Sequence, residues 1–481
     1  MNFVIPAFAP AIPEMVLLAM ASFILVADTI WSKRYQFATY YATQISLLVA
    51  GYFIMTSFAT TQVITFDGSF VRDSFADILK LFIILVSLGI FLFSKEYLLQ
   101  QKFFSGEYFV LGLFGVLGMF VMVSAHNFIT LYLGLEIMSL SMYAMIALRR
   151  DSGAAVEAAM KYFVLGALAT GILLYGFSMI YGATGSITLP EIAKIIDSGK
   201  ADTVVLSFGV VFIVIGLAFK LGAVPFHMWM PDVYHGAPTA VTLYLGTAPK
   251  IAGFAILYRL LAEGMPGLVS DWQTLIIILS VLSMIVSAFV AIVQENLKRM
   301  LAYSGIGHVG FLLLGVLAAN PDGYASAMFY SIVYAITGVA GFGMIIALSR
   351  TGNEFDKIAD FKGLNARNPW LAFMMLIVMF SMAGIPPFIG FFAKVIVIEE
   401  VVKAGFIWIA VIAVITAVIS AFYYLRVVKA IYFDKVEDET PLTPVSSELN
   451  WAVSLVSIAL LVLGLMPSSL IELSYQSIGV Q

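Results

Sequence analysis

The chain has 481 residues, of which 25 are Lys or Arg and 29 are Asp or Glu, so only 11% are charged while 62% are hydrophobic. A soluble domain carries roughly 25% charged residues, so this composition excludes a soluble globular enzyme and predicts a protein of the lipid bilayer. The net charge of −4 without a basic run excludes a nucleic-acid-binding protein, and the absence of Cys excludes disulfides, cysteine-ligated iron–sulfur clusters and thiolate zinc sites in this chain.

Apolar stretches long enough to cross a membrane recur along the whole chain. A transmembrane helix needs roughly 20 apolar residues, and the strict alternation of a membrane β-barrel is absent. The pattern predicts an all-α polytopic membrane protein with about 14 transmembrane helices. In chain order, we expect them at 11–31, 37–58, 73–94, 107–125, 128–148, 154–181, 203–230, 238–260, 273–293, 300–319, 324–348, 370–399, 405–433 and 450–470.

Positive charges are distributed unevenly between the two sides of the predicted bundle. Of the 25 Lys and Arg, 15 lie in loops after odd-numbered helices, 5 lie in loops after even-numbered helices, and 5 lie inside predicted helices. Because loops rich in Lys and Arg remain cytoplasmic, we expect the loops after odd-numbered helices in the cytoplasm. Both termini are then expected on the outer, periplasmic side.

Two stretches of the sequence resemble each other. Residues 222–229 read GAVPFHMW and residues 384–391 read GIPPFIGF, so Gly, Pro and Phe recur at an offset of 162. A second match, between AMKY at 159–162 and AMFY at 327–330, has an offset of 168. A five-helix unit used twice explains both matches, and its odd number of helices would invert the second copy in the membrane. Chance similarity between apolar strings rich in Gly and Pro is the alternative.

The repeat and its proline motifs predict two broken helices, and the repeat also divides the chain into four segments. A Pro inside a membrane helix removes a backbone donor and frees a carbonyl group, which only protein or water can satisfy there. We therefore expect helices 7 and 12 to be discontinuous and to line a hydrated cavity; a simple kink is the alternative. The segments are an N-terminal three-helix part at 1–106, the first repeat (helices 4–8) at 107–262, the second repeat (helices 9–13) at 263–433, and a cytoplasmic loop with helix 14 at 434–481.

Several ionisable residues lie inside the predicted helices. A charge at the bilayer centre costs from about 3 to more than 10 kcal/mol, so such residues face the bundle interior and have partners. Glu136, Lys220 and Lys250 are the deepest, and each of the two lysines adjoins a proline-containing stretch. Lys394 follows the second proline motif but lies closer to a helix end. Glu157 and Lys161 have the i, i+4 spacing that lets them meet on one helix face.

The residue types indicate proton transfer. Arg keeps its proton at any accessible pH, whereas burial lets Lys lose one and a nearby carboxylate stabilises its charged form. We therefore interpret Glu136, Lys220, Lys250 and Lys394 as a proton relay that needs neither metal nor cofactor. His227 and His308 could connect the lysines, since His titrates near neutrality. The alternative for each group is a structural salt bridge or hydrogen bond, which is the preferred interpretation for Lys80, His126 and His235.

The motifs around the prolines resemble a known family. The strings KLGAVPFHMWMPDVYHGAPTAV at 220–241, GTAPK at 246–250 and GIPPFIGFFAK at 384–394 are similar to those of the proton-conducting membrane transporters, the antiporter-like subunits of respiratory complex I and of Mrp antiporters. The resemblance covers essentially the whole chain and is strongest from 127 to 394. Lys394 stands where the M-type subunit carries Glu, and the fourteen expected helices lack the long lateral helix of the L-type subunit.

The resemblance implies roles for the buried groups. Glu136 would pair with Lys220, Lys250 would be the central relay, and Lys394 would exchange protons with the outer side. It also implies an H⁺-translocating NADH:quinone oxidoreductase in the bacterial inner membrane, in which other subunits carry FMN, iron–sulfur clusters and quinone and neighbouring antiporter-like subunits are partners. No cofactor is expected in this chain. A cation/proton antiporter subunit of the Mrp type and a non-conducting membrane scaffold are the alternatives.

Overall fold

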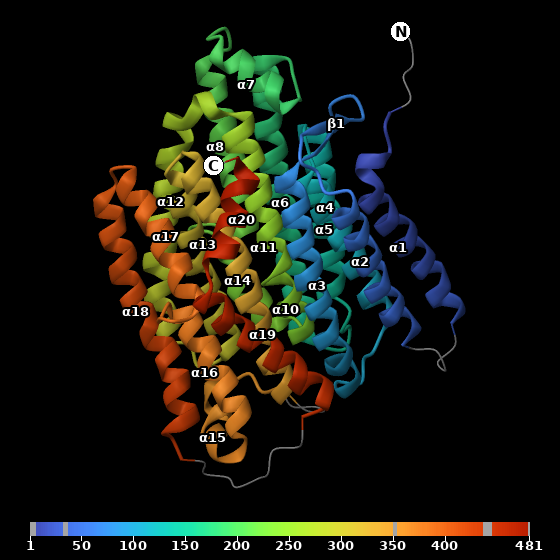
Figure 1. The fold of residues 1–481 in the computed structure, drawn as a ribbon, viewed down its shortest axis with the longest axis vertical. Coiled ribbons are helices and arrows are strands. Elements are labelled where there is room, and N and C mark those ends of the chain that lie inside the picture. Colours follow the sequence, from blue (N-terminus) through green and yellow to red (C-terminus); the bar gives the residue numbers. More distant parts are fainter. Residues whose placement is uncertain (1–5, 32–36, 350–353, 436–444, 480–481) are drawn as a thin grey trace.

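Long helices form nearly the whole protein. The structure, a computed structural model, describes residues 6–31, 37–349, 354–435 and 445–479. The long helices run mostly along one common direction (Figure 1), with α7 at one end of the bundle and α15 at the other. The predicted loop cations Lys33, Arg34 and Arg350, and most of the predicted loop at 434–450, lie outside the described residues.

The N-terminal part contains three long helices and a small hairpin. A 3-10 turn (Ala9–Ala11) leads into α1 (Ile12–Ile30), and α2 (Ala38–Thr56) and α3 (Ser74–Gln100) follow. Between α2 and α3, β1 (Val63–Thr65) pairs antiparallel with β2 (Phe70–Arg72). This hairpin is a small departure from the all-helical expectation. Its turn includes Phe66, Asp67 and Gly68 with positive φ angles.

Side-chain caps begin the helices that follow. Asp73, Ser105, Asn127 and Ser152 each accept a backbone N–H from the first turn of the next helix, which satisfies a donor that the helix itself cannot use. These caps begin α3 and the next three helices at defined residues. The three are α4 (Gly106–Val123), α5 (Phe128–Ile146) and α6 (Gly153–Thr184), and the short α7 (Leu189–Asp197) follows them.

The predicted seventh and eighth helices are both interrupted. The seventh consists of α8 (Thr203–Leu221) and α9 (Trp229–Gly236), separated at the first proline motif as expected. The eighth was expected to be continuous over 238–260, and this was wrong: it consists of α10 (Thr239–Leu245) and α11 (Ala248–Leu257), continued by a π-helical segment (Tyr258–Gly264). Gly246 and Thr247, directly before Pro249, separate its two pieces.

The C-terminal half has the same mixture of long and broken helices. It contains a 3-10 turn (Pro266–Leu268), α12 (Val269–Ile292), α13 (Leu297–Leu317), α14 (Pro321–Leu348), a second 3-10 turn (Ile358–Phe361) and α15 (Leu364–Arg367). The expected break of helix 12 separates α16 (Pro369–Ala383) from α17 (Ile389–Lys403). The last helices are α18 (Ile407–Tyr432), α19 (Ser447–Leu465) and α20 (Ser468–Ile478); the predicted helix at 450–470 ends earlier than expected, because Pro467 separates α19 from α20.

Within the described ranges, twelve helices are long and apolar enough to cross a membrane. The chain is therefore an all-α polytopic membrane protein. The two other expected spans correspond to α2 and to the α16–α17 pair, which are not among the twelve. The most enclosed segments are α10–α11 and α14, in each of which 94% of an apolar 18-residue stretch is buried. The corresponding share is 39% for α1, α6, α18 and α19. The broken eighth helix thus lies at the centre of the bundle.

Close contact between α4 and α5 depends on two glycines. A Cβ on Gly134 would lie 2.6 Å from the backbone nitrogen of Met122, and one on Gly118 would lie 2.5 Å from that of Met138. Small residues allow such a backbone approach between membrane helices. The contact fixes the position of α5, which carries Glu136.

We predict that Gly134→Ala separates α4 from α5 and destabilises the protein by roughly 1–3 kcal/mol, as overpacking does elsewhere. The measurement is the amount of assembled subunit in purified membranes after heating. Gly171→Ala in α6 is the matched control, because a Cβ there meets nothing within 4 Å. Equal thermal loss for the two variants would contradict the role given to this contact.

Candidate functional site

The break after α8 leaves backbone carbonyl groups inside the bundle. α8 ends because Gly222 takes a left-handed conformation with φ of 80°, which Gly adopts without a steric penalty, and because Pro225 has no N–H to continue the helix. Two side chains satisfy the free carbonyl groups. The indole nitrogen of Trp229 donates to the carbonyl of Phe219 at 2.9 Å, and Nζ of Lys250 donates to the carbonyl of Leu221 at 2.7 Å.

The break after α16 has a matching arrangement. Gly384 takes φ of 82°, and Pro387 follows it. Nζ of Lys394 donates to the carbonyl groups of Met382 at 3.0 Å and Ala383 at 2.8 Å. An ammonium group is favoured at this position because the helix dipole is negative at the carboxyl end of a helix. Each break thus holds one buried lysine. Lys250 at the first break comes from the next predicted span, whereas Lys394 at the second break comes from the interrupted span itself.

Lys220 adjoins the first break. It precedes Leu221, whose carbonyl group holds Lys250, and its own Nζ donates to Oγ of Ser139 at 2.9 Å. Ser139 lies three residues after Glu136, so the two share a face of α5. No ion pair within 4.0 Å joins Glu136 to Lys220, and Oε1 of Glu136 is buried without a hydrogen-bond partner among the described residues.

Lys250 lies at the centre of the site. Only 3% of this residue is exposed, and its Nζ lies 5.9 Å from the centre of the Trp229 ring, which can stabilise a cation. Because Lys250 binds the carbonyl group next to Lys220, the same backbone break joins the two lysines. Neither lysine lies near the ends of the bundle.

His308 lies beside the second break. Its Nδ1 is 2.7 Å from the hydroxyl of Tyr330, and its Nε2 is 3.1 Å from the hydroxyl of Tyr424. A cavity of about 10 Å³, lined by His308, Ser381 and Met382 among others, adjoins the carbonyl group that Lys394 binds. This volume is roughly enough for one water molecule. His308 thus lines a small cavity next to the carbonyl group of Met382, to which Lys394 donates.

Among the described residues, the other expected groups form no hydrogen bond with these lysines. His227 is buried in the first break, but its Nδ1 has no hydrogen-bond partner in the described part of the chain. His126 lies between α4 and α5, outside the spans; burial lowers its pKa, and the Arg259 charge lowers it further against the opposing effect of Asp73. Lys80 forms a buried ion pair with Glu14 at 2.5 Å, as its structural interpretation predicts.

Glu157 and Lys161 lie in a charged cleft rather than deep in the bundle. Their side chains are 67% and 43% exposed, and they form an ion pair at 2.8 Å. Lys161 also binds Asp232 at 2.8 Å, and Asp232 binds Arg299 at 2.9 Å. The cleft has a volume of about 190 Å³. Sequence reasoning missed Asp232, although it lies inside the string 220–241, because no spacing rule joins it to α6 or α13.

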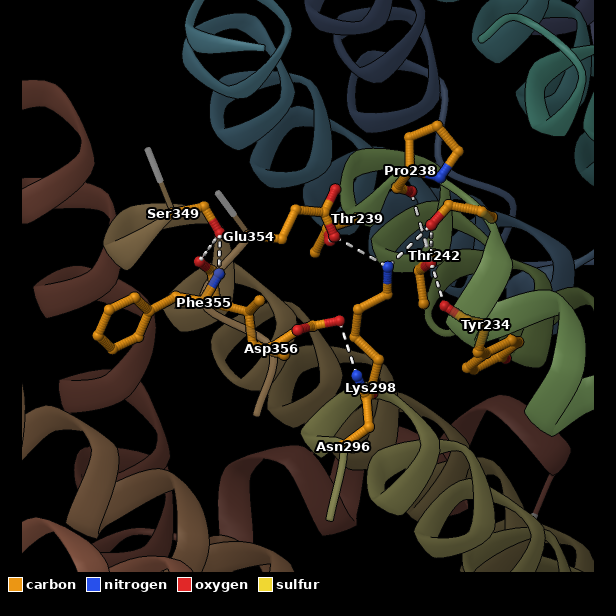
Figure 2. Close-up of polar contacts among 12 residues, drawn as sticks. Tyr234, Pro238, Thr239, Thr242, Asn296, Lys298, Ser349, Glu354, Phe355 and Asp356 are labelled. Atoms are coloured by element: carbon orange, nitrogen blue, oxygen red, sulfur yellow. Dashed lines mark hydrogen bonds and ion pairs between the residues drawn. The ribbon is translucent and has the colours of Figure 1, made fainter. Parts of the chain in front are cut away.

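A second polar cluster was also missed. Lys298 is 2% exposed, and its Nζ donates to the carbonyl of Ala237 at 2.9 Å and to the carboxylate of Glu354 at 3.1 Å. Figure 2 shows this lysine side chain extending between the segment that begins α10 and the segment after α14. Tyr97 and Thr239 also donate to Glu354. The cluster therefore ties four elements together at the end of the bundle that carries α15.

Glu354 lies outside the spans, and its ionisation contributes to this cluster. Burial acts to raise its pKa, but the Lys298 charge and the hydrogen bonds from Tyr97, Thr239 and Lys298 outweigh burial and hold the pKa below its usual value. A carboxyl group with a lowered folded pKa stabilises the fold above its unfolded pKa of roughly 4.3, and this stabilisation is lost as the pH falls through the folded pKa.

Broken helices with buried lysines on their free carbonyl groups are typical of ion-translocating membrane proteins. Among the residues that the structure describes, no group of three or more His, Cys, Asp or Glu could hold a metal ion. The fold and the site together therefore define a class of ion-translocating membrane subunit.

Comparisons with known proteins identify the family. Residues 125–420 match the family described as NADH:quinone oxidoreductase/Mrp antiporter, TM, and residues 4–95 match the N-terminal family of NAD(P)H-quinone oxidoreductase subunit 2. The NADH-quinone oxidoreductase subunit N of Hydrogenovibrio crunogenus is 76% identical over 478 residues, which cover 99% of this chain and 100% of that protein. The subunit N of Thioalkalivibrio sulfidiphilus is 52% identical over 480 residues and 100% of both chains.

Solved structures agree with this assignment. A chain of respiratory complex I from Thermus thermophilus with bound aureothin is 28% identical, with a TM-score of 0.83 over 96% of this chain and 100% of that chain. A chain of the Mrp complex from a Dietzia species is 21% identical, with a TM-score of 0.81 over 98% of this chain and 96% of that one, and shows the shared fold alone. The chain belongs to the subunit N family of NADH-quinone oxidoreductase. It is a proton-translocating membrane subunit of complex I and works with other subunits in the cell membrane.

We predict that Glu354→Gln weakens the Lys298 cluster. The backbone amides at 354–358 should then exchange with deuterium roughly tenfold faster at pH 7, which corresponds to a loss of about 1.4 kcal/mol of local stability. Glu107→Gln, at an exposed position in the first turn of α4, is the control. Unchanged exchange at 354–358 would show that the carboxylate charge does not hold this segment.

Proposed function

We propose that protons cross the membrane part of this subunit along the buried groups Glu136, Lys220, Lys250, His308 and Lys394. The observation that carries the proposal is the pair of matched helix breaks, each with a buried lysine on its free carbonyl groups. A lysine in such a position has a hydrogen-bond acceptor for its ammonium form and little water to stabilise its charge, so its protonation state depends on the few groups around it.

The first part of the relay connects α5 with the first break. The Glu136 carboxylate stabilises the ammonium form of Lys220, and Ser139 holds the Lys220 side chain at 2.9 Å. Without a proton, Lys220 is a neutral amine and is no longer stabilised by the charge of Glu136. The proton that leaves Lys220 can pass to Lys250. The carbonyl group of Leu221 accepts from Lys250 at 2.7 Å and orients its ammonium group beside the break. His227, five residues after Gly222 in the same break, is a further group that could relay a proton there.

The second part of the relay connects the centre with the second break. His308 receives a proton on one ring nitrogen and releases one from the other, with Tyr330 and Tyr424 as its hydrogen-bond partners. Water in the small cavity beside Met382 passes the proton to Lys394. Lys394 then releases it to the outer side. Glu157 and Lys161, in the cleft with Asp232, lie at the inner side, where protons enter.

The same proposal includes the architecture. We infer fourteen spans, with α2 and the α16–α17 pair as the two that join the twelve, and two inverted five-helix units at 107–262 and 263–433 between an N-terminal segment (1–106) and a C-terminal one (434–481). Support comes from the matched breaks, each with a Gly of positive φ followed by a Pro. The opposite positions of α7 and α15 in Figure 1 agree with an outer loop after helix 6, a cytoplasmic loop after helix 11 and two periplasmic termini.

We assign the redox chemistry to other subunits. The chain has no Cys for iron–sulfur clusters, so we place FMN, these clusters and the quinone site elsewhere in complex I, and we expect neighbouring antiporter-like subunits beside this one in the bacterial inner membrane. Coupling of NADH oxidation to proton movement is favoured over gradient-driven cation/proton exchange because the similarity to subunit N extends over the whole chain. The scaffold alternative leaves the matched buried lysines without a purpose.

Substitution of Lys250 tests the relay. Lys250→Arg retains the positive charge but removes titration, since Arg keeps its proton. We predict about a hundredfold less proton pumping per NADH oxidised, the lower end of the usual contribution of a positioned proton-transfer group. The measurement is quenching of a pH-sensitive dye in vesicles that contain the intact complex.

Lys429→Arg, whose side chain is 68% exposed, is the control and should pump normally. Native gels establish that both variants assemble. Undiminished pumping by an assembled Lys250→Arg complex would contradict the role of Lys250 as a titrating relay.

A further inference from the structure

An apolar groove lies on the membrane-facing side of the bundle, away from the relay. Its volume is about 500 Å³, and its walls come from α2, α3, α14 and α19. It opens outward, because Leu85 in one wall is 56% exposed and Leu455 in another is 71% exposed. All of its lining residues except Gln44 are apolar. The proton relay uses none of these residues.

The length of the groove corresponds to one leaflet of a bilayer. Along α19 the lining runs from Ala452 to Leu463, which spans about 17 Å at the helical rise of 1.5 Å per residue. The hydrocarbon core of a membrane is about 30 Å thick, so one leaflet contributes about 15 Å. The groove therefore extends from one side of the membrane to about its middle.

A polar cluster closes one end of the groove. Lys95 and Glu448 form an ion pair at 2.6 Å, and Nζ of Lys95 lies 5.2 Å from the centre of the Tyr40 ring. Each of these residues lies about one helical turn from a groove residue of the same helix. Tyr40 is one turn from Gln44 on α2, Lys95 is one turn from Leu92 on α3, and Glu448 is one turn from Ala452 on α19. Lys and Tyr are enriched at the membrane–water interface. The cluster thus marks the headgroup level, on the side expected to be cytoplasmic.

Gln44 provides an unused hydrogen-bond acceptor inside this end. Its Nε2 donates to the hydroxyl of Tyr40 and to the carbonyl of Leu88, both at 3.3 Å. Its Oε1 is buried without a partner among the described residues. A buried acceptor of this kind costs free energy unless a donor reaches it, so the occupant of the groove is expected to carry a hydroxyl or ammonium donor next to its apolar part.

The shape and lining of the groove suit an extended hydrocarbon chain. The groove runs about 17 Å along α19, and its lining is apolar apart from Gln44. A side chain from outside could fill only part of this length.

We propose that this groove is a binding site for a phospholipid of the cytoplasmic leaflet. One acyl chain lies between α3 and α19, and the headgroup lies beside Lys95 and Glu448, where a donor from the headgroup or glycerol reaches Gln44. A headgroup that carries an ammonium group suits the site best. Its ammonium group can pair with the exposed Glu448 carboxylate, which leaves Lys95 free to bind the phosphate. The site connects the N-terminal helices with α19, so its lipid also joins the two ends of the chain.

Photocrosslinking of the intact complex tests this site. The complex is reconstituted in phosphatidylethanolamine and phosphatidylglycerol vesicles containing a phosphatidylethanolamine probe with a diazirine in one acyl chain, then washed with detergent to exchange loosely held lipid, and irradiated. We expect labelled peptides from α19 and α3. Ala459→Phe and Gly89→Leu, which fill the groove from opposite walls, should each lower this labelling about tenfold, because close packing leaves the chain no room.

The control is Leu168 of α6, which is 63% exposed and lies outside the groove. Its weaker labelling should be the same in the wild type and both variants, and NADH oxidation by each variant establishes that the complex is assembled. Labelling of α19 no stronger than that of α6, or unchanged by both substitutions, would overturn the proposal.

Discussion

The structure depends on one constraint: a backbone carbonyl group released inside a membrane protein must find a donor. Water is scarce there, and an unsatisfied carbonyl group costs several kcal/mol. In this protein Lys250 and Trp229 donate to carbonyl groups of the first break, and Lys394 donates to two carbonyl groups of the second. The same contacts hold the lysines away from lipid and water. The interruption of a helix and the burial of a titratable cation are therefore a single arrangement.

This arrangement links structure to proton transfer. The lysines are held at fixed positions by backbone atoms, so the charges around them determine whether each one keeps its proton. Lys220 donates to Ser139 of α5, and the carbonyl group of Leu221, the residue after Lys220, accepts from Lys250. His308 has a tyrosine hydroxyl at each ring nitrogen and lines the small cavity beside Met382, whose carbonyl group accepts from Lys394. Removing one member changes the electrostatic environment of the next, which is why charge-preserving substitutions are informative here.

Much of the fold could be predicted from the sequence because hydropathy and proline are local signals. The long helices and the breaks near Pro225 and Pro387 follow from such signals. The interruption of the eighth helix at Gly246 was missed, since one Gly before a Pro has no distinctive pattern in an apolar stretch. The β1–β2 hairpin was missed for a similar reason, as its strands are only three residues long.

The site was predictable in its residue types but not in its contacts. Buried lysines are conspicuous because charge in hydrocarbon is expensive, and so Lys220, Lys250 and Lys394 could be selected. Their partners are backbone carbonyl groups and Ser139, which sequence does not distinguish from hundreds of others. The i, i+4 spacing correctly joined Glu157 to Lys161, but it carried no information on depth, and their side chains are 67% and 43% exposed. Lys298 and Glu354 meet across 56 residues of chain, beyond any spacing rule.

The most direct test is a structure of the intact complex at a resolution that shows individual water molecules. The account predicts ordered water that links Lys250 through the surroundings of His308 to Lys394, with Lys250 and Lys394 still bound to the carbonyl groups of their helix breaks. Dry, close-packed side chains between Lys250 and His308, in every state of the working complex, would contradict it.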